Sequence, residues 1–176
     1  IAIVHVEDYQ NNIIKKHEDT LKEREELFGN YLDITGFNAE PVLLTYPDNN
    51  FLNSIYEKYS PIRSEYEFTT HTKRLHKLWV IDNPLDITLI ENEFKKMDAI
   101  YIADGHHRTA SSNYLAEKLK LENKHHTGNE GYNFFMGYLI SDSNLKISEF
   151  NRFIKDLNGL NKTQFIEKLS EHYTIE

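Results

Sequence analysis

Hydrophobic and polar positions along the chain form blocks that predict both strands and helices. Short apolar runs predict buried strands at residues 1–6, 41–46, 99–103 and 133–140. Alternating positions predict an antiparallel pair of strands at 65–72 and 76–80. Apolar residues spaced by three and four predict helices at 15–32, 51–59, 84–97, 106–121 and 161–173. Turns are predicted at 7–12 and 47–50, and a further strand at 145–153.

The order of these elements predicts the fold class. Strands and helices follow one another without strict alternation, which favours an α/β or α+β fold with a mixed sheet and flanking helices. The 176 residues suit a single domain. The chain opens on an apolar run without Met, and residues 172–176 resemble the start of another strand. We therefore expect a fragment of a longer protein.

Composition narrows the classes of partner. The net charge of −8 gives a surface that repels nucleic-acid phosphates and anionic lipid headgroups. The chain has no cysteine, which excludes disulfides, Cys-ligated zinc and thiol chemistry within this segment. No apolar run approaches the roughly 20 residues that span a bilayer. We expect a cytoplasmic protein that acts on a small molecule, without a nucleic-acid or membrane partner; the sequence indicates no oligomeric state.

The most informative segment joins the strand at 99–103 to the helix at 106–121. Asp104 and Gly105 separate them, and the helix begins with His106, His107 and Arg108. The first turn of a helix presents free backbone N–H groups and a positive dipole end, which attract anions. Three potentially cationic side chains at that end are unfavourable unless an anion compensates them. We therefore predict that this segment binds a phosphate-bearing small molecule.

Each residue type in this segment suits a particular role. Gly105 lets the backbone approach a ligand, and Arg108 can bind phosphate through two parallel N–H groups. His106 and His107 can transfer a proton near neutral pH, and Asp104 can bind Mg²⁺, act as a base or orient a histidine. The alternative is a plain strand–helix turn, in which Asp104 caps the helix and the histidines lie at the surface.

Other polar clusters leave two interpretations open. His17, Glu18, Asp19 and Thr20 either meet the first site or cap a helix, and the sequence slightly favours a cap. The paired His125 and His126 are more typical of an exposed loop than of a metal site. Asn133 belongs to a core strand or to the site, and Arg152 makes either a second anion contact or a surface ion pair.

The segment Tyr-Ile-Ala-Asp-Gly-His-His-Arg at 101–108 resembles the hallmark of domain-of-unknown-function family 1015, found in bacteria and archaea. Segments at 17–20, 40–46, 78–80, 133–136 and 151–159 resemble further blocks of that family in the same order. The Gly-x-x-Arg at 105–108 is similar to the phosphate-binding turn of the ParB and sulfiredoxin superfamily, which includes free-serine kinases. His106 stands where sulfiredoxin has Cys, so a sulfiredoxin-type reaction is excluded.

These resemblances imply a ParB/sulfiredoxin-like core around 99–121, ADP or ATP with Mg²⁺ as cofactor, and a link to serine metabolism. The leading hypothesis is an enzyme of phosphoryl transfer or phosphate-ester hydrolysis on a serine-like metabolite. Two alternatives are a non-catalytic nucleotide- or metabolite-sensing module and a metal-dependent hydrolase built on Asp104, His106 and His107. For the leading hypothesis the expected residues are Asp104, His106, His107 and Glu18 in catalysis, Gly105, His107, Arg108 and Thr109 at the cofactor, and His17, Thr20, Asn133 and Arg152 at the substrate.

Overall fold

The computed structural model describes residues 1–175 of the chain. These residues fall into two compact units, one spanning Ile1–Leu145 and one beginning at Lys146, and each is described by itself. The first unit holds a mixed sheet with flanking helices, so the predicted fold class is confirmed.

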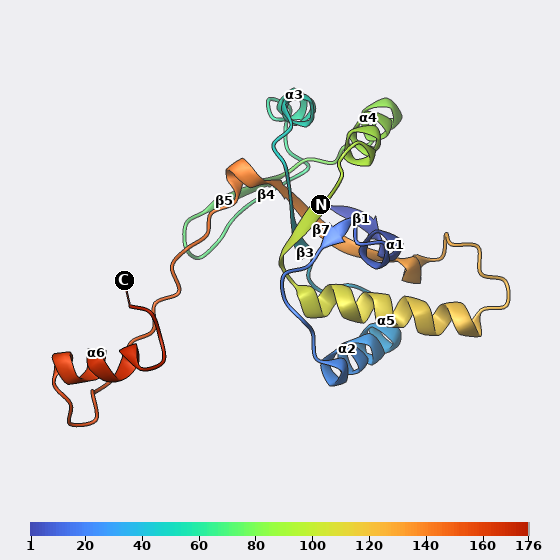
Figure 1. Ribbon diagram of the computed structural model, residues 1–176. Coiled ribbons are helices and arrows are strands. Elements are labelled where there is room, and N and C mark those ends of the chain that lie inside the picture. Colours follow the sequence, from blue (N-terminus) through green and yellow to red (C-terminus); the bar gives the residue numbers. More distant parts are fainter. Residues whose placement is uncertain (176) are drawn as a thin grey trace. The chain divides into compact units, whose positions relative to one another are not determined.

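The sheet of the first unit has five strands (Figure 1). Their order is β1 (Ala2–His5), β7 (Phe134–Ser141), β3 (Val42–Tyr46), β6 (Ile100–Asp104) and β2 (Ile14–Lys15). The pairs β1–β7 and β3–β6 are antiparallel, whereas β7–β3 and β6–β2 are parallel. The three inner strands, β7, β3 and β6, are predicted apolar runs, and the sheet is mixed as expected.

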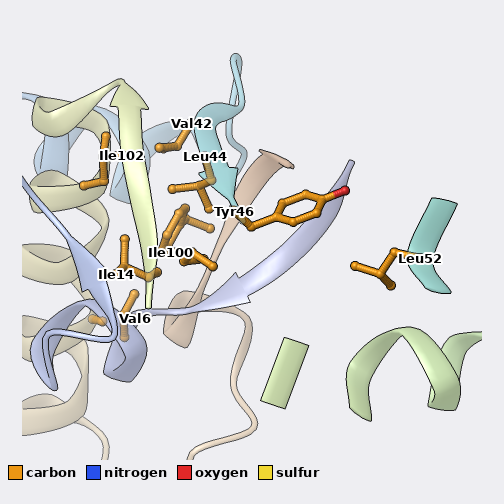
Figure 2. Packing of buried hydrophobic residues seen from close by; sticks show 10 residues of the cluster. Val6, Ile14, Val42, Leu44, Tyr46, Leu52, Ile100 and Ile102 are labelled. Atoms are coloured by element: carbon orange, nitrogen blue, oxygen red, sulfur yellow. The ribbon is translucent and has the colours of Figure 1, made fainter. Parts of the chain in front are cut away.

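A buried apolar cluster holds the sheet together. In β3 alternate residues are buried, because successive side chains of a strand point to opposite faces. Figure 2 shows Val42 and Leu44 of this strand near Ile100 and Ile102 of β6. Each such branched side chain contributes about 1.5–3 kcal/mol when fully buried. This cluster fixes the end of β6, from which the candidate site projects.

Helix α5 (His106–Glu122) lies between the sheet and helix α2 (Lys22–Thr35), and Figure 1 shows the two helices side by side. Because α5 is covered on two sides, it buries small residues, among them Thr109, Ser111 and Ser112. Gly29 of α2 permits the close approach, since a Cβ there would lie 2.5 Å from Cδ1 of Tyr114. The packing of α2 on α5 therefore fixes the surroundings of the first turn of α5.

The remaining elements of the first unit follow the predictions closely. Helices α3 (Asn50–Tyr59) and α4 (Pro84–Lys95) are capped by the side chains of Asn49 and Asn83. Strands β4 (Tyr66–Thr69) and β5 (Leu75–Leu78) form the expected antiparallel pair. Asp86, buried on α4, accepts hydrogen bonds from Lys58 and Tyr59 of α3, which joins the two helices.

Two predictions near the amino terminus are wrong. Residues 7–12 were predicted as a turn, but helix α1 (Val6–Gln10) occupies most of them, with the His5 side chain at its cap. A helix of five residues is too short to show a hydrophobic period. The helix predicted at 15–32 begins only at Lys22, because Ile14 is buried in β2 and holds the chain in the sheet. Residues 16–21 are left as a connecting segment.

Predictions for the carboxyl-terminal part are confirmed only for its helix. Helix α6 (Lys162–Ser170) lies within the predicted range, and the Asn161 side chain caps it. Residues 145–153 form no strand, and the Phe153 side chain is 97% exposed, so no neighbouring strand covers this apolar run. Residues 172–175 form no strand either, and Glu176 of that prediction lies outside the described residues. Short 3₁₀ turns, η1 (Gly131–Asn133) and η2 (Asp142–Asn144), flank β7.

Candidate functional site

A cavity of about 550 Å³ opens at the first turn of α5. This volume falls in the range of roughly 300–1,000 Å³ that is typical of small-molecule sites. Four parts of the first unit form its walls: the connecting segment 16–21, one face of α2, the segment before β3, and the turn between β6 and α5 with the start of that helix. The lining residues are Glu18, Phe28, Tyr31, Leu32, Asn38, Ala39, Glu40, Asp104, Gly105, His106, His107, Arg108 and Ser111.

Gly105 shapes the turn at the start of α5. Its backbone has φ 100° and ψ 30°, a left-handed conformation that side chains with a Cβ disfavour. Within the part of the chain that the structure describes, no side chain caps this helix end. The first-turn N–H groups of α5, which have no acceptor within the helix, therefore remain available to a ligand.

Arg108 lies over Gly105 and is held by oxygen atoms on two sides. Its Nη2 donates to Oδ2 of Asp104 at 2.5 Å, and its Nη1 donates to the backbone carbonyl of Pro41. The Glu40 carboxylate lies 3.5 Å from Nη1. A Cβ at position 105 would lie 3.2 Å from Cζ and Nε of Arg108, so a larger residue there would require the guanidinium to shift. Asp104 thus pairs with Arg108 instead of capping α5.

His106 is buried at the base of the cavity. Its side chain is 5% exposed, and burial first, then the neighbouring His17, lowers the pKa of His106 below its ordinary value. The backbone N–H of His17 donates to Nε2 of His106 at 3.4 Å. Since Nε2 accepts, Nδ1 carries the proton of the neutral ring. Near neutral pH, His106 is therefore an uncharged imidazole with its N–H on Nδ1.

Glu18 brings a carboxylate to that N–H. Its Oε2 lies 3.6 Å from Nδ1 of His106, which exceeds a hydrogen-bond length but gives an ion pair when the ring is protonated. The Glu18 side chain is 61% exposed and lines the cavity. The ring of His17 meets that of His106 edge to face, with centroids 4.4 Å apart. Of the two interpretations for residues 17–20, the structure places His17 and Glu18 at the site.

His107 follows on the same turn and lines the cavity. Its Nδ1 is buried and, among the residues that the structure describes, has no hydrogen-bond partner. Its backbone carbonyl accepts from the hydroxyl of Ser111, another cavity residue. This nitrogen is therefore a buried polar atom without a partner among the described residues, an arrangement that is rare in folded proteins.

Three predicted residues of the first unit do not line the cavity. Thr109 is fully buried and its hydroxyl donates to the Gly105 carbonyl, so it supports the turn from beneath. Thr20 bonds the Glu25 carboxylate on α2, and Asn133 lies in η1, where its amide donates to Glu130 at 3.0 Å. Arg152 belongs to the second unit.

The loop with His125 and His126 is organised by Glu130. The Glu130 carboxylate accepts from the backbone N–H groups of Thr127 and Gly128 and from the Thr127 hydroxyl. Burial raises the pKa of Glu130, but these donors together outweigh it and lower that pKa to about 2. His126 lies 3.2 Å from the same carboxylate. Within residues 1–175, no group of three or more His, Asp or Glu side chains is arranged to hold a metal ion.

The sequence analysis did not predict that residues of α2 or Glu40 line the cavity. Phe28, Tyr31 and Leu32 share one face of α2, and their spacing of three and four residues was the available signal. Glu40 precedes Pro41 in a segment where only the strand was predicted.

In the described chain, no helix combines the length and apolar character that crossing a membrane requires.

The sequence matches one family model over residues 1–176, described as a protein of unknown function, DUF1015. The chain belongs to the DUF1015 family. Comparisons with curated proteins and with solved structures gave no match. The predicted family resemblance is confirmed, while the similarity to the ParB and sulfiredoxin superfamily stays a prediction. In this DUF1015 chain, the segment 104–108 forms one wall of the cavity.

Proposed function

We propose that this DUF1015 protein binds a phosphate-bearing metabolite in the cavity at 104–108 and acts by phosphoryl transfer or phosphate-ester hydrolysis. The observation that carries the proposal is the start of α5, where no side chain caps the helix and Arg108 lies over the turn, both at the wall of the 550 Å³ cavity. Uncapped N–H groups, the helix dipole and a guanidinium together suit a phosphate group.

Arg108 has N–H groups that could donate to a phosphate. A guanidinium has five N–H groups, and the contacts to Asp104 and Pro41 use two of them, which leaves three. Asp104 then orients Arg108, and Arg108 neutralises charge that develops on a transferred phosphoryl group. Since Asp104 is paired with a cation, it is a weaker candidate for the general base.

Glu18 is the better candidate for the base. Its carboxylate is exposed to the cavity and lies beside the Nδ1–H of neutral His106. Glu18 would accept the proton of an attacking hydroxyl, and His106 would hold the carboxylate in place. Nucleotide phosphates with Mg²⁺ fit the same cavity, because Mg²⁺ is commonly bound by one or two carboxylates together with phosphate oxygens. Glu18 would supply such an oxygen, and the ion would neutralise phosphate charge.

A calorimetric titration with ADP and ATP, with and without Mg²⁺, tests the binding. We expect saturable binding to the wild type, at least tenfold weaker binding to Arg108→Lys, and none to Arg108→Ala, because lysine keeps the charge but not the fork of donors. Arg74→Ala is the matched control, since Arg74 is exposed on the β4–β5 turn and removes the same charge. Equal binding by the wild type and Arg108→Ala would refute the site.

Product formation separates an enzyme from a sensing module. We expect transfer of the terminal phosphoryl group of ATP to the serine hydroxyl, or hydrolysis of phosphoserine by water. Glu18→Gln should slow turnover by a hundredfold or more, while the affinity for nucleotide measured without Mg²⁺ should stay nearly unchanged. Tight binding without product over hours would establish the non-catalytic alternative.

A further inference from the structure

We infer that the ligand of this cavity is a nucleotide, whose planar base packs on Phe28 and Tyr31 of α2. The inference rests on the proposed phosphate site and adds the chemical class of the ligand. It concerns the part of the cavity wall that α2 forms, rather than the turn at 104–108 where we place the phosphate.

Phe28 and Tyr31 are partly exposed aromatic residues of α2, the helix that packs on α5. Their side chains remain 40% and 48% exposed, although both line the cavity. They lie three residues apart, so they share one face of α2 and form a continuous aromatic surface. Leu32 extends that surface. Aromatic faces of this kind stack planar bases without requiring hydrogen bonds to them.

The size and polarity of the cavity match such a ligand. The polar and charged groups gather at the α5 turn, at Glu18 and at Glu40, whereas the α2 wall is apolar. A free phosphate or phosphoserine would fill the polar end and leave the aromatic wall in water. A nucleotide places phosphate at one end and a ring at the other, so both walls are used. The apolar wall alone would also suit an acyl phosphate, and the test below separates these ligands.

The experiment compares ADP with pyrophosphate, which shares the two phosphates but lacks the nucleoside. Each is titrated into the wild-type chain and into Tyr31→Leu, Tyr31→Phe and Phe28→Leu. Ile34→Ala is the matched control, because Ile34 is exposed on α2 and does not line the cavity. Thermal melts verify folding, and leucine preserves both helix propensity and apolar character.

We expect the wild type to bind ADP about tenfold or more tightly than pyrophosphate, given the usual strength of base stacking on aromatic residues. Tyr31→Leu and Phe28→Leu should each remove much of that advantage and leave pyrophosphate binding unchanged. Tyr31→Phe and Ile34→Ala should behave as the wild type.

The outcomes separate the two proposals. Arg108-dependent pyrophosphate binding with no gain for ADP would overturn the nucleotide inference and leave the phosphate site standing. An ADP advantage that survives both leucine substitutions would overturn the assignment of the base to α2. If neither ligand binds, the proposed phosphate site fails as well.

Discussion

Replacing Gly105 with alanine should strain the backbone at this residue and also displace the Arg108 side chain. The φ of 100° places residue 105 where a Cβ is strained, and such strain costs about 1–3 kcal/mol. The new Cβ would also lie 3.2 Å from Cζ and Nε of Arg108, closer than ordinary contact. Alanine returns about 0.4–1 kcal/mol by restricting the unfolded chain. We expect a net loss of about 1–3 kcal/mol of unfolding free energy.

Gly36→Ala is the matched control for this prediction. Gly36 also has a positive φ, 71°, but a Cβ there would meet nothing within 4 Å. Its penalty should be about 1 kcal/mol or less, from backbone strain alone. Urea unfolding measures both variants, and at a slope of 1–3 kcal/mol per M, a loss of 2 kcal/mol lowers the midpoint by about 1 M.

A double-mutant cycle isolates the contact with the guanidinium. In an Arg108→Ala background the contact with the guanidinium is gone, so Gly105→Ala should cost only its backbone strain, less than it costs in the wild type. The single Gly105→Ala variant should also bind anions more weakly, since Arg108 must move. An equal penalty with and without Arg108 would refute the idea that glycine is required beneath the guanidinium.

Three further predictions concern other parts of the first unit and the buried His106. Because the pKa of Glu130 is lowered to about 2, its contribution to stability is present above its ordinary pKa of about 4.3 and is lost as pH falls toward 2. Glu130→Gln should abolish this pH dependence and speed hydrogen exchange at Thr127. By NMR, His106 should titrate below its ordinary pKa, and Glu18→Gln should lower that pKa further, since Glu18 raises it. Because the folded state favours the neutral ring, the contribution of His106 to stability is present above about pH 6.5 and is lost as the pH falls through the lowered pKa. Gly29→Val should destabilise by about 1–3 kcal/mol through overpacking, measured by urea unfolding.

The sequence predicted the central strands and longer helices because their hydrophobic periods are long enough to read. It predicted the segment 104–108 for a local reason as well, since Gly105 and the charged helix start are adjacent in the chain. The part of the cavity formed by α2 could not be predicted from the sequence, because Phe28 and Tyr31 approach that segment only through the packing of α2 on α5. The position of Glu18 likewise depends on Ile14 pairing with β6, a contact between residues 86 positions apart.

The structure also changes the physical basis of the predicted anion site. From the sequence, three potential cations at a helix start seemed to need an anion. In the fold, burial keeps His106 neutral near pH 7, and Asp104 and Glu40 already offset the charge of Arg108. At the proposed site, the attraction for phosphate would therefore come from directed donors, namely the first-turn N–H groups of α5 and the N–H groups of Arg108 that Asp104 and Pro41 do not use, because net charge at the turn is small. Directed donors of this kind favour a ligand of fixed geometry, such as a phosphate, over anions in general.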